Sequence, residues 1–110
     1  MDQPADIEAE LTFLTTAEGG RKTSCRSGLG NYRAPCDFGH PEGWNDALFE
    51  FVDKEWVSPG ECVIARMWFL YPEYQAGHLR TGFEFTVHEG ARAVARGTVK
   101  QVLNTSLLKL

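Results

Sequence analysis

The sequence predicts an all-β domain, either a closed barrel or a sandwich. Apolar and polar residues alternate in several short segments, and glycine and proline residues separate these segments, a pattern that is typical of strands joined by turns. No segment has the apolar spacing of an amphipathic helix. The chain has 110 residues, of which 43% are apolar, and this suffices for one domain with a single core. About six short strands of this kind favour closure, because a closed barrel has no exposed edge strand.

The first half of the chain contains three expected strands. Residues 6–14 place the apolar side chains from Ile7 to Phe13 on one face and polar side chains on the other, as in a half-buried strand. A long glycine-rich turn is expected at residues 17–35 because glycine permits backbone conformations that other residues rarely adopt. Short strands are then expected at residues 35–39 and 45–52.

The longest apolar run, residues 62–71, predicts a central strand. It follows residues 58–61, where a proline–glycine pair suits the middle of a tight turn. Both faces of the run are apolar, and its β-branched and aromatic residues favour a strand over a helix. Cys62 is expected in the core, and Trp68 and Tyr71 are expected to be partly buried.

Two further strands are expected near the end of the chain. Residues 83–90 alternate cleanly, which predicts an inner and an outer face. The inner face is Phe83, Phe85 and Val87, and the outer face is Glu84, Thr86 and His88. Residues 91–103 form the last expected strand, in which Gly97 predicts a bulge or a sharp bend.

Four short motifs occur in a recognisable order. They are EGGRKT at residues 18–23, NYRAP at 31–35, SPGE at 58–61 and FEFTVHEGARAVARGTV at 83–99. Together they resemble the C-terminal third domain of bacterial elongation factor Tu, and the resemblance covers nearly the whole chain. It implies a closed six-stranded antiparallel β-barrel. The expected organisation is a barrel at residues 6–104, with an N-terminal tail at 1–5 and a C-terminal tail at 105–110.

The resemblance also implies a function without catalysis. In elongation factor Tu the third domain has no catalytic residue; it packs on the other two domains, helps to hold the T-stem of aminoacyl-tRNA and contacts the nucleotide exchange factor. This chain has no G-x-x-x-x-G-K-[ST] motif, so no GTPase activity and no bound nucleotide are expected. We expect a binding module of this type, with no catalytic residue and no cofactor, and with a role connected with translation.

Departures from the family pattern favour a protein partner over RNA. Ala34 and Pro35 stand where the family has proline and glutamine, so an amide that could reach RNA is missing. Ala93 stands where the family has threonine. The net charge of −4 argues against broad binding of nucleic acid. The alternative is an RNA- or tRNA-binding module that uses the basic segment 21–33.

Six cationic residues are candidates for binding a partner or an anion. Arginine in particular suits phosphate, because its guanidinium donates paired hydrogen bonds. The alternatives are a solvated loop or pairing of Arg21 and Arg33 with Glu18 or Glu89. The candidates are Arg21, Lys22, Arg26, Arg33, Arg92 and Arg96.

Three aromatic residues are candidates for a protein interface. Trp44, Trp56 and Tyr74 lie in or near segments without a counterpart in the family. Exposed aromatic side chains are frequent anchors at interfaces. Each could equally cover the end of a small barrel.

Cysteine chemistry is the weakest alternative. Cys25, Cys36 and Cys62 form no C-x-x-C pair, so we expect no metal site, even with His40 nearby in sequence. A small hydrolase would need a pair such as Cys36–His88 or Cys62–His88, without a recognisable oxyanion hole. An odd number of cysteines, no secretory signal and no apolar run of membrane length lead us to expect a cytoplasmic chain that spans no membrane.

Overall fold

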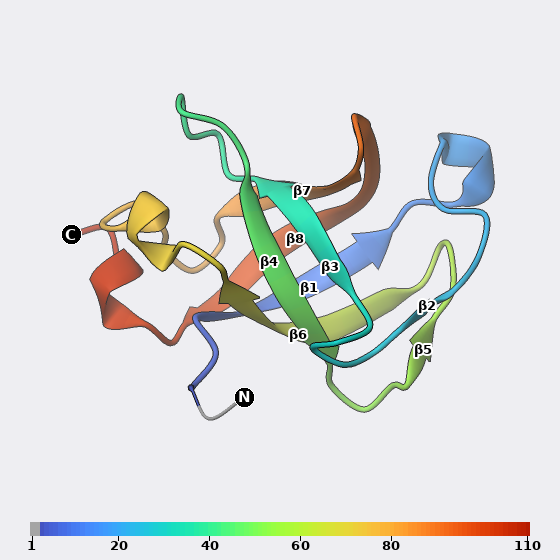
Figure 1. Ribbon diagram of the computed structural model, residues 1–110, viewed down its shortest axis with the longest axis horizontal. Helices are drawn as coiled ribbons and strands as arrows, with labels where there is room; N and C mark the ends of the chain where they lie inside the picture. The colour runs from blue at the N-terminus through green and yellow to red at the C-terminus, as the bar shows by residue number, and fades with distance from the viewer. Residues whose placement is uncertain (1–2) are drawn as a thin grey trace.

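Six antiparallel strands close into a barrel in the computed structural model, which describes residues 3–110 (Figure 1). The strands are β1 (Ile7–Phe13), β3 (Arg33–Asp37), β4 (Asn45–Phe51), β6 (Cys62–Phe69), β7 (Glu84–Glu89) and β8 (Arg92–Val102). Their order around the barrel is β1-β6-β4-β3-β7-β8, and β8 pairs with β1 to close it. The predicted all-β class and the six-stranded antiparallel closure are confirmed.

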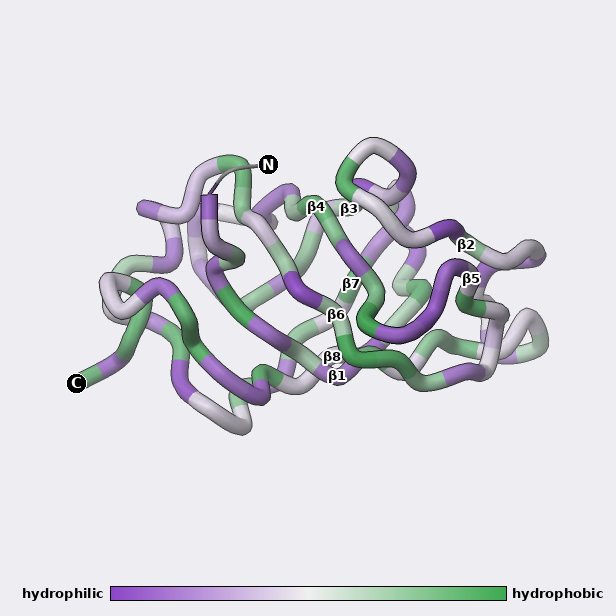
Figure 2. Tube along the Cα trace, turned by 90° about the horizontal axis from the view of Figure 1, so that it is seen from below, coloured by the Kyte–Doolittle hydropathy of each residue, from purple (hydrophilic) through white to green (hydrophobic). Residues whose placement is uncertain are grey.

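Alternation along the strands fills the interior of the barrel. Every second residue of β1 from Ile7 to Phe13 is buried, and β4 shows the same pattern. Figure 2 shows how hydrophobic and hydrophilic residues follow one another along the strands. Phe85 and Val87 are buried, and Phe83 packs partly buried against the same core. The predicted inner faces of the first strand and of β7 are therefore correct.

The sequence predicts a bulge or a sharp bend at Gly97; no bulge lies there, and the glycine is a packing site in β8. The ladder register is continuous there, since Gly97 pairs with Leu11 of β1 and with Phe85 of β7. A Cβ atom at this position would lie 2.3 Å from Cζ of Phe85. The glycine thus leaves room for an aromatic ring, and the register shifts lie elsewhere, between Val87 and His88 and near Glu8.

The glycine-rich segment contains more structure than the expected turn. After η1 (Thr16–Glu18) the chain forms β2 (Cys25–Arg26), which pairs with β5 (Trp56–Val57) in a two-stranded ribbon. Gly19 ends η1 with a φ of 93°, and a Cβ atom at Gly20 would lie 2.3 Å from the Leu14 carbonyl oxygen. In Figures 1 and 2 the ribbon lies at the end of the molecule opposite both chain termini.

The two ends of the chain are joined through Asp6. One carboxylate oxygen accepts a hydrogen bond from the Phe69 amide at 2.8 Å, and the other accepts from the Asn104 side chain at 2.9 Å. The segment 105–110, expected as a tail, contains η3 (Thr105–Leu107), and Leu107 is buried. In the expected N-terminal tail, Ala5 is buried, while residues 1–2 lie outside the described part.

Two expectations for the long apolar run are wrong. Cys62 is exposed, because it is the first residue of β6 and its thiol lies on the outside of the barrel, 3.3 Å from the hydroxyl of exposed Thr12. Tyr71 is also exposed, since it lies beyond the end of β6, just before η2 (Pro72–Gln75). Trp68 is buried. Across residues 3–110, the helical segments are too short and too polar to cross a membrane.

Candidate functional site

The six candidate cations do not form one cluster. Four of them are paired with carboxylates on the barrel or its ribbon. The pairs are Arg21–Glu89, Arg26–Glu55 at 3.2 Å, Arg33–Asp46 at 2.8 Å and Arg96–Glu18 at 3.6 Å. Of the alternative pairings considered for Arg21 and Arg33, the structure has Arg21 with Glu89. The partner of Arg33 is Asp46 instead, because Arg33 lies on β3 beside β4.

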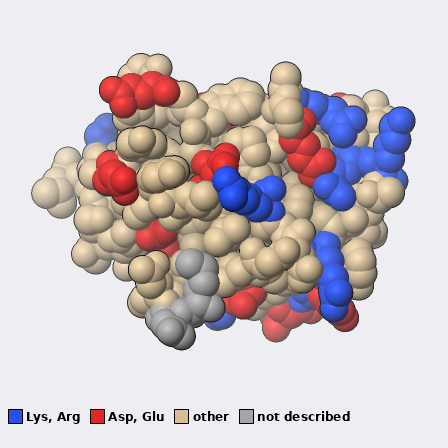
Figure 3. Space-filling model, viewed as in Figure 1, with Lys and Arg blue, Asp and Glu red and all other residues tan. Residues whose placement is uncertain are grey.

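Three of the cations do meet, in a groove at the ribbon end of the barrel. Arg21, Lys22 and Arg92 line it together with Thr23 and Glu89. In Figure 3 the Lys and Arg side chains gather at the right end of the face shown, which is the end of η1, β2 and β5. Within residues 3–110, Lys22 and Arg92 form no ion pair. The groove is nevertheless lined by the chain's own carboxylate, Glu89, which pairs with Arg21.

Glu89 binds two partners that arise from separate segments. The Arg21 guanidinium pairs with it, and the Tyr32 hydroxyl donates a hydrogen bond to it at 2.9 Å. The guanidinium also lies 5.7 Å from the centre of the Tyr32 ring. Burial and the neighbouring Glu89 charge raise the pKa of the Tyr32 hydroxyl, so it remains a donor. Arg21 is therefore part of the packed structure and not of a solvated loop.

A second recess lies at the other end of the barrel, where the loop before β4 meets η2. Trp44 and Tyr74, two of the expected interface residues, both line it. Trp44 is 45% exposed and Tyr74 is 52% exposed. We call this site the aromatic recess; it is lined by His40, Glu42, Gly43, Trp44, Asn45 and Tyr74, and its volume is about 130 Å³.

Stacking fixes both aromatic rings of the recess. The Trp44 ring lies 4.0 Å from the His88 ring at an angle of 24°. His88 bonds to Thr86 at 2.7 Å, so both project from the outer face of β7, as predicted. His88 is nonetheless buried, because Trp44 covers it. The Tyr74 ring stacks on Tyr71 at 5.6 Å and 27°.

Hydrogen bonds join the two segments that form the aromatic recess. The buried Gln75 side chain donates to Asn45 Oδ1 at 2.6 Å, and Asn45 donates to the Tyr71 carbonyl at 3.1 Å. On the loop, the Glu42 amide donates to His40 Nδ1 at 3.2 Å, and the Gly43 amide donates to the His40 carbonyl at 3.1 Å. The rings of the recess are therefore attached to an ordered frame.

Trp56, the third aromatic candidate, lies on β5, in the ribbon at the opposite end of the molecule from this recess. It is 55% exposed, and the Arg26 guanidinium lies 5.9 Å from its ring centre. Arg26 reaches it because β2 pairs with β5. Trp56 therefore has a cation from its own chain on its ring.

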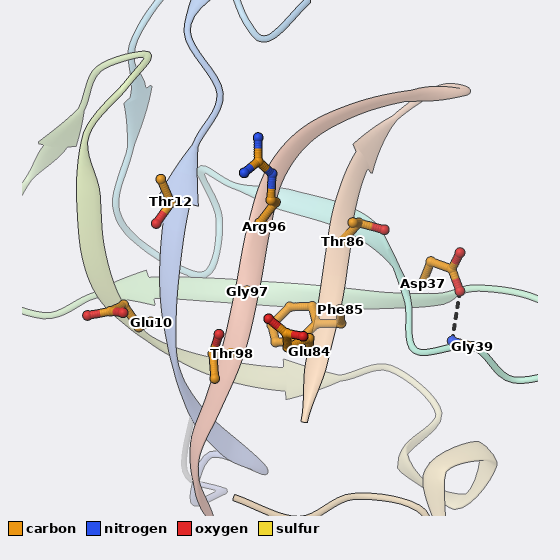
Figure 4. Close-up of a pocket in the computed structure, with 10 residues that line it drawn as sticks. All are labelled: Glu10, Thr12, Asp37, Gly39, Glu84, Phe85, Thr86, Arg96, Gly97 and Thr98. Carbon is orange, nitrogen blue, oxygen red and sulfur yellow. Dashed lines mark hydrogen bonds between the residues drawn. The ribbon is translucent and has the colours of Figure 1, made fainter. Parts of the chain in front are cut away.

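A shallow groove lies on the outer face of β1, β8 and β7, and Gly97 and Phe85 are among the residues that line it (Figure 4). Its carboxylates, Glu10, Glu84 and Asp37, project from different strands and do not converge in Figure 4. Asp37 accepts a hydrogen bond from the Gly39 amide at 2.8 Å. This groove lacks the convergent acid, base or nucleophile that catalysis requires.

The cysteines do not form the pairs that a hydrolase would need. Cys36 is fully buried and directs its thiol toward the Ala34 carbonyl at 3.8 Å, and burial raises its pKa. Burial also raises the pKa of the Cys25 thiol, to about 11. Cys62 lies on β6, which is not adjacent to the β7 strand of His88. Among residues 3–110, no three histidine, cysteine or carboxylate side chains gather as metal ligands.

Sequence patterns identified Trp44 and Tyr74 but missed Glu42, Tyr71 and His88. The signal for Tyr71 was its position before a proline, where a strand ends. No pattern in the sequence indicates that Trp44 covers His88, because the contact joins the loop before β4 to β7, two segments far apart in the sequence. No known family model matches the chain.

Proposed function

We propose that this chain is a non-catalytic binding module that recognises a protein partner through the aromatic recess. The observation that carries the proposal is that Trp44, Tyr71 and Tyr74 are about half exposed and yet are fixed by stacking. Tyrosine and tryptophan dominate binding hot spots, and rings that are already ordered lose little side-chain entropy on binding. The barrel supplies the rigid support for these loops.

We further propose that the module is of the elongation factor Tu third-domain type. The support is the order of the four motifs in the sequence, together with a six-stranded antiparallel barrel of the kind that the resemblance implies. A cytoplasmic role connected with translation belongs to this proposal.

RNA binding is the second candidate, and the groove of Lys22 and Arg92 favours it. These two cations are free of carboxylate partners within the described residues. Neutralisation of the other four candidate cations counts against it, because phosphate contacts supply most of the affinity for nucleic acid. Binding through phosphates would weaken steeply as salt is raised.

Affinity capture from an extract of the source cells, with and without nuclease, tests the proposal. We expect a protein that survives nuclease and moderate salt, and whose purified form binds about 10-fold or more weakly to Tyr74→Ala and Trp44→Ala. Trp56→Ala is the matched control and should bind normally, because it removes a tryptophan of similar exposure at the other end of the molecule. A partner that binds all three variants equally, or that is recovered only with RNA, would contradict the proposal.

A further inference from the structure

Two arginines of this chain share the same kind of environment. Arg21 lies over the Tyr32 ring at 5.7 Å and pairs with Glu89. Arg26 lies over the Trp56 ring at 5.9 Å and pairs with Glu55 at 3.2 Å. In both places an aromatic face and a carboxylate together bind one guanidinium, as expected from the negative face of the ring and the negative charge beside it.

The aromatic recess has these components without the arginine. Its walls include Trp44 and Tyr74, and Glu42 lies on the same wall two residues before Trp44. Within residues 3–110, Glu42 forms no ion pair, and neither Trp44 nor Tyr74 has a cation over its ring. Five arginines of the described chain are paired with carboxylates elsewhere, Arg92 lines the opposite groove, and Arg80 lies in the loop after η2 without lining the aromatic recess.

The dimensions of the recess fit one side chain. Sites for cofactors and drug-sized ligands have volumes of about 300–1,000 Å³, and the aromatic recess has about 130 Å³. The surrounding surface carries acidic side chains: in Figure 3 red side chains lie over η2 and the loop before β4 with a single blue one between them, whereas most blue side chains lie toward the far end. Such a surface attracts a basic segment and repels an acidic one.

We propose that the aromatic recess binds an arginine side chain of the partner protein, with the guanidinium against Trp44 and Tyr74 and paired with Glu42. This inference rests on the proposed function, since it names the group that the partner inserts. Arginine is preferred to lysine because its planar guanidinium stacks on rings and donates paired hydrogen bonds to a carboxylate.

The test uses small probes, so it requires no identified partner. Nα-acetyl-arginine amide, the lysine amide and the neutral citrulline amide are titrated at constant ionic strength into ¹⁵N-labelled protein. The readouts are the indole N–H signals of Trp44 and Trp56 and the amide signal of Gly43. We expect saturable shifts at Trp44 and Gly43 with the arginine probe, weaker ones with lysine and none with citrulline.

Glu42→Gln separates charge from shape without disturbing the core, because Glu42 is exposed. We expect this variant to bind the arginine probe about 3- to 5-fold more weakly, whereas the control Glu55→Gln at the other end should bind it normally. The inference is wrong if citrulline or lysine binds as tightly as arginine, if Glu42→Gln has no effect, or if Trp56 shifts as much as Trp44.

The two proposals fail separately. Suppose that a partner binds through Trp44 and Tyr74, but that the arginine and citrulline probes bind equally well. Only the arginine inference would then be wrong. If the arginine probe binds specifically but no protein is captured, the recess is a site for a small cationic ligand, and the proposed protein-binding function is wrong.

Discussion

At the residue scale, the absence of a side chain at Gly97 makes room for a ring of the core. The Phe85 ring occupies the space in which any other residue at position 97 would place its Cβ atom. Phe85 is itself 4% exposed and stacks on Phe38 at 4.6 Å, so the ring has little room to move. Close packing of this kind makes the interior sensitive to one added carbon.

We expect Gly97→Ala to lower the free energy of unfolding by about 1–3 kcal/mol, the usual cost of overpacking a core. Gly30→Ala is the control, because a Cβ atom there would meet nothing within 4 Å, and its effect should stay within about 0.5 kcal/mol. Urea denaturation of both variants measures the difference. Equal midpoints would mean that the ring can move aside.

Phe85→Ala provides the complementary test. Alone it should cost about 3–5 kcal/mol, as is usual for a buried phenylalanine. Combined with Gly97→Ala it should cost less than the sum of the two, because the added methyl group then occupies part of the cavity. Additive costs would contradict the contact between these two residues.

At the scale of elements, an ion pair between Arg21 and Glu89 attaches the segment between η1 and β2 to β7 of the barrel. Arg21 and Glu89 have side chains that are 21% and 27% exposed, whereas Arg26 and Glu55 are 53% and 66% exposed. Solvent screens the second pair far more strongly than the first. Two ion pairs in neighbouring strands and loops should therefore differ in their contribution to stability.

We expect Arg21→Ala to cost about 1–2 kcal/mol, because it leaves Glu89 without its charged partner in a partly buried position. Arg26→Ala should cost no more than about 0.5 kcal/mol. Thermal and urea unfolding of the two variants decide this. If both lose the same amount, Arg21 behaves as a surface residue and the segment is held by its other contacts, such as the 2.9 Å hydrogen bond between the Ser24 and Ser58 hydroxyls.

The elements differ in how far the sequence could predict them. Alternation sufficed for β1 and β7, where each second side chain enters the core. It failed for β2 and β5, because two-residue strands contain too few positions to show a period. It also missed the burial of His88, because the strand pattern gives the face and not the loop residue, Trp44, that covers it.

The candidate site was predictable only as separate residues. Trp44 and Tyr74 stood out by type, but their meeting depends on Asn45 and Gln75, whose hydrogen bond joins β4 to η2. Likewise, the sequence suggests that the cationic residues of the glycine-rich segment form one basic cluster. It does not show which carboxylates pair with them in the folded chain. Tertiary pairing distributed Arg21, Arg26 and Arg33 to three acids.

At the scale of the whole molecule, the barrel separates two chemically different ends. The ribbon end has the cationic groove and two arginine–aromatic pairs, while the aromatic recess lies toward the other end with acidic side chains around it. Between them, the closed core buries two thiols and one phenol that ionise readily only when the chain unfolds. Because these groups ionise more readily in the unfolded chain, we expect the stability of the fold to decrease at alkaline pH.

The free energy of unfolding should therefore fall as the pH rises above about 9. Burial raises the pKa of the Cys25 thiol from 9.0 to about 11, and burial also raises the pKa of the Cys36 thiol and the Tyr32 hydroxyl. Above pH 9 the unfolded chain has lost protons that the folded chain retains, so each further rise in pH favours unfolding. For Cys25 the stabilisation is complete below pH 9 and is lost as the pH approaches 11.

Urea midpoints of the reduced protein at pH 8, 9.5 and 11 measure this loss. Cys25→Ala should flatten the decline by up to about 2 kcal/mol, the value of a shift of this size, even if the substitution lowers stability at every pH. Cys62→Ala removes an exposed thiol and should retain the decline, because Cys25 remains buried. If Cys25→Ala and Cys62→Ala decline in parallel, the Cys25 thiol ionises in the folded barrel, and the core near β2 is open to water.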